Sequence, residues 1–309
     1  MQRIRRAQAM RYEFVADEPL ITVQEGESFQ VETEDAGSGL VTSPEMADRI
    51  PSLPTKRSTP PKSNPIGGPI AVAGAEPGDL LEVEIESIDL QPTGYTNWGP
   101  DRTKIGDDFR WPELNRWTVR VFEHRDGSTF LDGERLWPTR PMVGCIGVAP
   151  EREALNTSTG QTISGGNLDS RDITTGTRVQ LNVYHPGALL FLGDVHASQA
   201  DTEYYGTADE TRAVVQARCR VIKGTRIPFI RLLKQDSIVA LRSGAPLAVL
   251  VDQAVEDLMR WLVDDYGVSP ERAYLHTCIN PDFRINVYQY TLGLATVGAE
   301  LPMRYLPAK

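Results

Sequence analysis

The sequence predicts a mainly β protein with one or two helices late in the chain. Its 309 residues include 26 glycines and 22 prolines, which favours many turns and short strands over long helices. Residues 28–34 and 80–90 alternate apolar and polar side chains with a period of two, as half-buried strands do. One segment, residues 246–266, carries apolar side chains at helical spacing. These three observations set the predicted fold class.

The first two predicted strands each follow a turn. Glu25-Gly26-Glu27 precedes residues 28–34, and a Pro-Gly-Asp turn precedes residues 80–90. Between these strands, residues 51–69 contain six prolines and two adjacent glycines, so we expect a loop there. A loop of this length inside a compact domain is often functional.

A tryptophan-rich segment follows, at about residues 91–141, and we expect it to form an excursion from the main sheet. It contains four of the five tryptophans, namely Trp98, Trp111, Trp117 and Trp137. Such residues form either a satellite hydrophobic cluster or a lid or subunit contact over a pocket, since aromatic side chains are favoured in both places.

The second half returns to strands and ends with helices. Strands are expected at residues 142–149, 178–184, 188–196 and 213–223. The helix over residues 246–266 ends at Gly267, and a second, short helix is expected to begin at Ser269-Pro270, where serine can cap and proline suits the first turn.

Charge and cysteine content exclude several classes of protein. The formal net charge of −10 disfavours binding to nucleic acid or to an anionic membrane surface. The three cysteines form no paired spacing, which argues against a disulfide framework and for a reducing compartment. The chain has neither an apolar stretch of bilayer length nor a signal-peptide core, so we expect a cytoplasmic protein.

The segment Gly193–Glu203 is the most unusual in the sequence. Asp194 and His196 are two residues apart at the end of an apolar strand, so their side chains are expected to point the same way. Asp201 and Glu203 repeat this spacing. Carboxylates placed together in a buried site repel one another unless a cation neutralises them. The alternative for Asp194 and His196 is a strand-end turn with a hydrogen-bonded histidine.

A second polar cluster contains paired glycines, Gly165 and Gly166, followed by Asn167 and Asp169. Paired glycines allow the backbone to approach a ligand closely. Histidine with aspartates is a mixed nitrogen and oxygen set that suits zinc and tolerates harder ions. The chain has no Gly-x-Ser-x-Gly elbow, no phosphate-binding loop and no dinucleotide fingerprint, and Cys145 lies between apolar residues, where a buried core thiol is expected.

Six short motifs, taken in order, resemble the acetamidase/formamidase family over about residues 20–305. They are Asn64-Pro-Ile-Gly-Gly-Pro69, Gly74-Ala-Glu-Pro-Gly-Asp79, Gly144-Cys-Ile-Gly-Val-Ala-Pro150, Gly165-Gly-Asn-Leu-Asp169, Pro186-Gly-Ala188 and Gly193-Asp-Val-His-Ala197, with Gly206-Thr-Ala208 and Glu210 closing the run. Each motif alone is a weak match, and together they are specific.

The resemblance implies a mainly β fold with a smaller α/β part. We expect a single domain over residues 1–309, with the excursion at about 91–141 and a C-terminal α/β portion at about 245–309. The family also implies a homodimer or higher homo-oligomer and hydrolysis of short amides to carboxylate and ammonia with a divalent metal, most often zinc, calcium being the alternative.

Carried over residue by residue, the resemblance makes Asp169, Asp194 and His196 the metal-binding set. Glu203, or else Asp201, becomes the catalytic acid/base that acts with a metal-activated water. We expect Asn167 to bind substrate, and the backbone N–H groups of Gly165 and Gly166 to stabilise the oxyanion.

The chain departs from the family pattern after the histidine. Ala200-Asp-Thr-Glu203 keeps both acids of the usual Gly-Asp-Gly-Glu but neither glycine. Two alternatives to a small-amide hydrolase therefore stay open. One is a metal hydrolase of the same family acting on a bulkier or cyclic amide or a urea-like compound, with the tryptophans lining a larger pocket. The other is a non-catalytic β-rich protein that binds a cation such as calcium.

Overall fold

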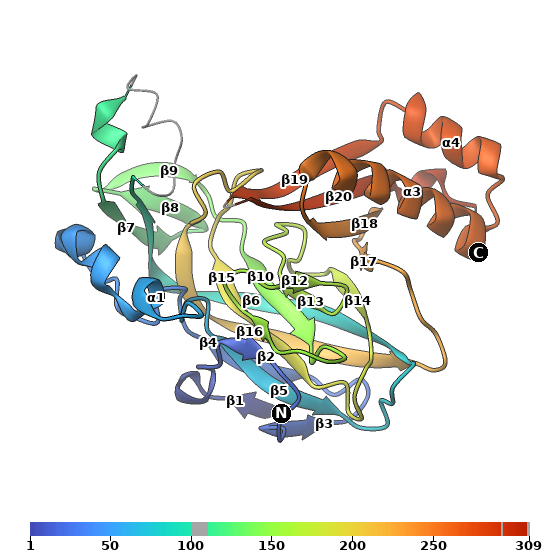
Figure 1. Ribbon diagram of the computed structural model, residues 1–309, viewed down its shortest axis with the longest axis horizontal. Helices are drawn as coiled ribbons and strands as arrows, with labels where there is room; N and C mark the ends of the chain where they lie inside the picture. Colours follow the sequence, from blue (N-terminus) through green and yellow to red (C-terminus); the bar gives the residue numbers. More distant parts are fainter. Residues whose placement is uncertain (101–110, 292, 308–309) are drawn as a thin grey trace.

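The structure is a computed structural model that describes residues 1–100, 111–291 and 293–307 (Figure 1). Within these residues, eighteen strands belong to one hydrogen-bonded, curled sheet, and β2 and β11 form a separate pair. In the described part of the chain the α-helices are α1, α3 and α4. The architecture is mainly β with a smaller α/β part, so the predicted fold class is confirmed.

The strands of the body precede the helical portion in the chain. They are β1 (Gln2–Ile4), β2 (Glu13–Phe14), β3 (Ile21–Val23), β4 (Phe29–Thr33), β5 (Ile66–Val72), β6 (Leu80–Trp98), β7 (Thr118–Arg125), β8 (Ser128–Leu131), β9 (Glu134–Pro138), β10 (Met142–Val148), β11 (Leu155–Asn156), β12 (Gln161–Thr162), β13 (Gly165–Asn167), β14 (Arg178–Asn182), β15 (Leu190–His196) and β16 (Glu210–Ile222). The predicted strands correspond to β4, β6, β10, β14, β15 and β16, with ends that differ by a few residues except in β6, which continues to Trp98.

The prediction of a loop over residues 51–69 is wrong at both ends. The 3-10 helix η2 (Pro44–Ser52) and helix α1 (Pro54–Arg57) occupy its start, and each helix begins with a proline, which is accepted in the first helical turn. Strand β5 begins at Ile66 and pairs with both β3 and β15. Its Gly67 lies so close to Val31 that an added Cβ would be 2.4 Å from the valine side chain. The absence of a side chain at Gly67 therefore permits close packing within a buried strand.

The tryptophan-rich segment extends the sheet through β6, β7, β8 and β9, while its residues 101–110 lie outside the described part of the chain. Trp117 packs against a cluster around Val41 and Tyr95. Trp98 makes an edge-to-face contact with Tyr205, and Trp137 is 45% exposed. Trp98 and Trp117 thus pack among aromatic and aliphatic neighbours, whereas Trp111 is as exposed as Trp137, so the choice between a satellite cluster and a lid or subunit contact stays open.

The C-terminal portion is a helix-covered sheet. It contains β17 (Ile230–Leu233), β18 (Ser237–Gly244), α3 (Leu247–Tyr266), α4 (Pro270–Cys278), β19 (Arg284–Thr291) and β20 (Leu294–Pro302). Helix α3 packs on β18 and β20 with Leu258, Trp261 and Leu262, and α4 lies beside it (Figure 1). The predicted cap of α4 is confirmed, because Ser269 Oγ accepts a hydrogen bond from the Arg272 N–H. No described helix is long and apolar enough to cross a membrane.

Strand β17 pairs with β14 of the body, so the sheet continues without a break into the C-terminal portion. The end of β15 lies near the centre of the molecule, close to where β19 and β20 meet the body (Figure 1). The single-domain organisation stays a prediction. The continuity of the sheet matters for the site, because it brings residues near position 290 to the end of β15.

Candidate functional site

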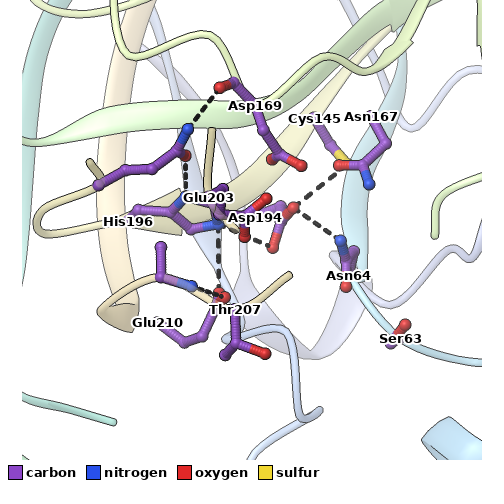
Figure 2. Close-up of polar contacts among 12 residues, drawn as sticks. Ser63, Asn64, Cys145, Asn167, Asp169, Asp194, His196, Glu203, Thr207 and Glu210 are labelled. Atoms are coloured by element: carbon purple, nitrogen blue, oxygen red, sulfur yellow. Dashed lines mark hydrogen bonds and ion pairs between the residues drawn. The ribbon is translucent and has the colours of Figure 1, made fainter. Parts of the chain in front are cut away.

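Asp194 and His196 lie at the end of β15, a strand whose seven residues are all buried. Near this end β15 is flanked by β10 on one side and β16 on the other. His196 Nε2 lies 3.6 Å from Asp194 Oδ1, so the structure brings these two predicted site residues together (Figure 2). Asp194 adopts a left-handed backbone conformation, with φ of 57°, which aspartate tolerates better than most residues.

Asp169 joins them from the turn after β13. One carboxylate oxygen of Asp169 and one ligand atom each of Asp194 and His196 lie within 4.8 Å of one another. Gly144 of β10 leaves room for this arrangement, because an added Cβ would lie 2.6 Å from Asp169 Oδ1 and 3.0 Å from Asp194 Oδ2. The proposed metal-binding set of Asp169, Asp194 and His196 is therefore assembled from two segments that are well separated in sequence.

Glu203 and Asp201 have different surroundings, although their spacing suggested a common direction. Glu203 is buried and lies near His196 and Glu210. Asp201 is half-exposed, with 49% of its side chain accessible, and it forms an ion pair with Arg171. The backbone between them turns through left-handed conformations, with φ of 74° at Thr202 and 39° at Glu203. The rule that residues i and i+2 point the same way holds only for extended backbone.

Glu210, the first residue of β16, is a site residue to which the sequence analysis assigned no role. It lies directly opposite His196 on the neighbouring antiparallel strand. Its Oε2 is 3.3 Å from His196 Nε2, and its Oε1 accepts a hydrogen bond from the Ala208 N–H. In the sequence, only its place at the end of the motif run marked Glu210 as a candidate site residue. Its contact with His196 depends on the register between β15 and β16.

The other carboxylate oxygen of Asp194 is held by two neutral donors. Asn64 Nδ2 donates to Asp194 Oδ2 at 2.8 Å, and the Cys145 thiol points to the same oxygen at 3.4 Å (Figure 2). Burial, and then the charges of Asp194 and Asp169, raise the pKa of Cys145 well above its ordinary value. Cys145 is therefore a buried neutral thiol, as the sequence indicated.

The glycine pair does not face the site directly. Gly165 and Gly166 belong to β13, which pairs with β10 and β12. Backbone of β10 and of Gly160 lies within 2.2 Å of where their Cβ atoms would be. Asn167 does line the cavity described below, and its side chain bridges Cys145 and the Ser158 carbonyl. The expectation that Gly165 and Gly166 would form an oxyanion site is thus not matched by their positions.

The cluster forms one wall of a cavity of about 220 Å³. Asp169, His196, Glu203 and Glu210 line its acidic side. Its other lining residues include the apolar Val41, Ile50, Leu53 and Leu294 and the polar Lys56, Asn64 and Gln289. None of the four tryptophans is among the lining residues of this cavity, whereas Trp137 lines a second cavity of about 550 Å³ that Glu203 also lines. The shape and polarity of the first cavity suit a small molecule with a polar end and an apolar end.

The buried acids perturb one another strongly. Burial raises the pKa of Glu203 to about 7, against the opposing charge of His196. Burial, followed by the charges of Glu203 and Asp194, raises the pKa of Asp169 well above its usual range. Burial alone would lower the pKa of His196, but Glu210 and Asp194 hold it well above its ordinary value. A concentration of negative charge of this kind is relieved by a bound cation.

The residues fit a divalent cation on structural grounds. Three buried carboxylate oxygens, Asp169 Oδ1, Asp194 Oδ1 and Glu210 Oε2, have no hydrogen-bond partner among the described residues. Each belongs to a residue that groups with His196 in the two candidate ligand sets, the second of which also includes Glu203. Unpartnered buried carboxylate oxygens are costly, so their gathering around His196 fits a site for a cation. Nitrogen and oxygen ligands together suit zinc.

Gln289 of β19 is a second residue that the sequence analysis did not identify. Its Nε2 donates to Asp169 Oδ2, and it also lies 3.5 Å from Glu203 Oε2. Its Oε1 accepts a 2.6 Å hydrogen bond from Gln161 Nε2, which fixes the direction of the amide. Nothing in the local pattern around residue 289 marks it as a site residue, because its contacts come from the packing of the C-terminal portion on the body.

The geometry can now be set beside known proteins. An acetamidase from Mycolicibacterium smegmatis is 26% identical over 263 residues, which are 66% of this chain and 63% of the acetamidase. The chain spans about three fifths of the length of the curated relatives that it matches.

Solved structures agree over nearly the whole chain. The crystal structure of an acetamidase from Bacillus halodurans is 30% identical, with a TM-score of 0.88 and coverage of 98% of both chains. That of an acetamidase from Yersinia enterocolitica is 28% identical, with a TM-score of 0.86 and coverage of 99% of this chain and 93% of the other. The sequence profile of the acetamidase/formamidase family matches residues 16–163 and 151–234. The chain therefore belongs to the acetamidase/formamidase family.

Proposed function

We propose that this chain hydrolyses a small carboxamide to a carboxylate and ammonia at the cavity beside β15, with a divalent metal ion. The observation that carries the proposal is the presence of two candidate ligand sets of buried acids that share His196, at the wall of a cavity of about 220 Å³. Membership of the acetamidase/formamidase family supports the reaction class. The homo-oligomer and the cytoplasmic location expected from the sequence stay predictions.

Asp169, Asp194 and His196 are the proposed ligands of the ion, with zinc favoured by the mixed donor set and calcium as the alternative. Glu210 faces His196 Nε2 from the neighbouring strand. A divalent ion held there would polarise a carbonyl oxygen and lower the pKa of a bound water molecule to about 7. Asn64 and Cys145 keep Asp194 in place through its second oxygen. Gln289 does the same for Asp169.

Glu203 is the proposed acid/base. Its carboxyl group lines the cavity beside His196 and Glu210, within reach of the space where a water and the amide carbon meet. Glu203 takes a proton from the attacking water as the new C–O bond forms and returns it to the amide nitrogen as the C–N bond breaks. The return of the proton matters because an amide anion is a very poor leaving group. General acid/base catalysis of this kind contributes about 10²–10⁴-fold.

The apolar side of the cavity favours a second candidate, a bulkier carboxamide. At about 30 Å³ for each water-sized group, 220 Å³ holds roughly seven such groups, more than formamide or acetamide needs. Ile50, Leu53 and Leu294 would contact the acyl chain. One added methylene in such a pocket is worth about 1–3 kcal/mol of transition-state binding. Activity that rises from acetamide to butyramide would support this candidate.

The first test measures ammonia release from formamide, acetamide, propionamide and butyramide by purified protein. Each substrate is assayed before chelation, after chelation, and after zinc is added back. Glu203→Gln is expected to lower kcat by about 10²–10⁴-fold, and His196→Ala is expected to abolish metal-restored activity. Asp201→Asn is the matched control, because its exposed carboxyl pairs with Arg171 outside the cavity, and it should keep wild-type activity.

Two outcomes would overturn the proposal. Full activity of His196→Ala or of Glu203→Gln would show that the substituted residue has no part in catalysis. Metal-loaded protein that releases ammonia from none of the four amides would exclude simple carboxamides as substrates. Calcium bound through oxygen atoms alone, without His196, would instead support a non-catalytic cation-binding protein.

A further inference from the structure

Gln199 lies three residues after His196 and makes three hydrogen bonds inside the protein. Its Nε2 lies 2.6 Å from the backbone carbonyl oxygen of Asp169 and 2.9 Å from that of Tyr288. Its Oε1 lies 2.9 Å from His196 Nδ1. The side chain therefore connects His196 to the segment that carries Asp169 and to β19.

The two carbonyl contacts fix which end of the Gln199 amide faces the histidine. A backbone carbonyl oxygen only accepts hydrogen bonds, so the NH₂ group must be the end that faces Asp169 and Tyr288. The amide oxygen is left facing the imidazole. Because this oxygen is also only an acceptor, His196 Nδ1 must carry a hydrogen.

A hydrogen on Nδ1 leaves Nε2 as the nitrogen that can bind a cation through its lone pair. Nε2 is the ring atom that faces the acids, at 3.3 Å from Glu210 Oε2 and 3.6 Å from Asp194 Oδ1. Both of these oxygens are buried and lack a hydrogen-bond partner within the described chain. The ring therefore presents Nε2 to the two candidate ligand sets that share His196, one with Asp169 and Asp194 and the other with Glu203 and Glu210.

We infer that Gln199 is a positioning residue: it holds His196 in the Nδ1–H tautomer and directs Nε2 towards the buried acids, where a divalent cation would bind. The inference rests on the metal site of the proposed function, but not on the identity of the substrate. A hydrogen-bond partner on the second ring nitrogen of a metal-binding histidine typically contributes 10–100-fold in metal affinity. Gln199 supplies that partner with a neutral amide oxygen.

Two substitutions separate positioning from a merely structural role. Gln199→Met keeps the length of the side chain but removes the acceptor for Nδ1–H. Gln199→Glu keeps an acceptor for Nδ1–H but loses the NH₂ group and places a carboxylate near two carbonyl oxygens. If Gln199 only tied the backbone segments together, the Glu variant would be at least as impaired as the Met variant. If it positions the imidazole, the Glu variant keeps most of the metal affinity.

The experiment measures the zinc dissociation constant of each variant by competition with a chelator of known affinity. We expect Gln199→Met to bind zinc about 10–100-fold more weakly than wild type and Gln199→Glu to lie close to wild type. Gln180→Met is the matched control, because Gln180 is a buried glutamine whose amide bonds to Glu82 on the distant pair β14 and β6. It should leave zinc affinity unchanged.

A spectroscopic readout tests the tautomer directly. In zinc-loaded protein labelled with ¹⁵N-histidine, the ring of His196, assigned by its loss in His196→Ala, should show a protonated Nδ1 and a metal-bound Nε2. Zinc binding through Nδ1 would overturn the inference, as would wild-type affinity in Gln199→Met or equal impairment of the Met and Glu variants.

The outcomes for Gln199 and for the enzyme are distinguishable. Wild-type protein that binds zinc through Nε2 and hydrolyses no amide would overturn the proposed function and leave the role of Gln199 intact. An active enzyme whose Gln199→Met variant binds zinc with wild-type affinity would overturn the role of Gln199 and leave the proposed function intact. Wild-type protein that takes up no divalent ion would overturn both.

Discussion

Four residues around the candidate metal centre have left-handed backbone conformations, which residues other than glycine rarely adopt. The φ angles are 56° at Asn64, 40° at Asp169, 57° at Asp194 and 39° at Glu203. Aspartate and asparagine tolerate this region, whereas a glutamate there is less usual. Residues in such conformations persist only when their surroundings hold them, and they gather at functional sites. Here the surroundings are the hydrogen bonds and close contacts that aim each carboxyl group at His196.

Gly144 is the clearest case of a single residue that shapes the site by leaving space. An added Cβ would lie 2.6 Å from Asp169 Oδ1 and 2.9 Å from the Asp194 backbone oxygen. Gly144→Ala should therefore displace both carboxylates by several tenths of an ångström and lower kcat/KM by about 100-fold. Steady-state kinetics with bound metal measured in parallel checks this.

The control for Gly144→Ala is Gly147→Ala on the same strand. Its added Cβ would meet the Ser164 backbone oxygen at 2.8 Å, so it is similarly crowded but lies away from the carboxylates. Both variants should lose stability, and only Gly144→Ala should lose activity per folded molecule. Equal activity in the two variants would show that the space at Gly144 has no functional role.

At the scale of elements, local patterns predicted strands but not the contacts between them. The alternation in residues 28–34 and the apolar run before Asp194 were sufficient for β4 and β15, because these signals belong to one strand. The pairing of His196 with Glu210 depends on the register between β15 and β16. The loop between these strands turns at Glu203, and the spacing of residues in the sequence does not predict that turn. Of the site, the sequence therefore yielded Asp169, Asp194, His196 and Glu203, but not Glu210.

The turn before β6 is an element whose stability should depend on pH. Asp79 accepts hydrogen bonds from Lys223 Nζ and from the Gly224 N–H, beyond the end of β16, and from the Glu76 N–H within its own turn. The bond from Lys223, followed by that from Gly224, lowers the pKa of Asp79 to about 2. In the unfolded chain an aspartate has a pKa of about 3.9.

A carboxyl group whose pKa is lowered by folding stabilises the folded state above its unfolded pKa and loses this effect as the pH falls. Asp79→Asn should thus cost about 1 kcal/mol at pH 7, a modest amount because Lys223 is largely exposed to solvent. The difference from wild type should shrink as the pH falls from about 4 towards 2. Urea unfolding between pH 7 and pH 3 measures it, with Asp89→Asn, an exposed carboxyl of β6, as the control. A difference that is constant with pH would contradict the assignment.

At the scale of the whole molecule, the site is assembled from segments that are far apart in the chain. Asn64, Gly144, Asp169 and the segment from Asp194 to Glu210 come from the body, and Gln289 comes from the C-terminal portion. The family profile matches residues 16–163 and 151–234, so Gln289 lies beyond the matched region. Thr291 and Leu294 also reach the cavity from there. The helix-covered sheet therefore has a direct part in the site as well as its own hydrophobic core.

This arrangement predicts that a change in β19 impairs chemistry at β15. Gln289→Met keeps the volume of the buried side chain but leaves Asp169 Oδ2 without its donor, and an unpaired buried carboxylate oxygen is costly. Asp169 should then shift, so kcat should fall by about 10–100-fold and zinc affinity should weaken in parallel. Tyr290→Phe, an exposed neighbour on the same strand, is the control and should match wild type in both measurements. A Gln289→Met enzyme that unfolds at a lower temperature, yet keeps wild-type kcat and zinc affinity when folded, would confine the C-terminal portion to a structural role.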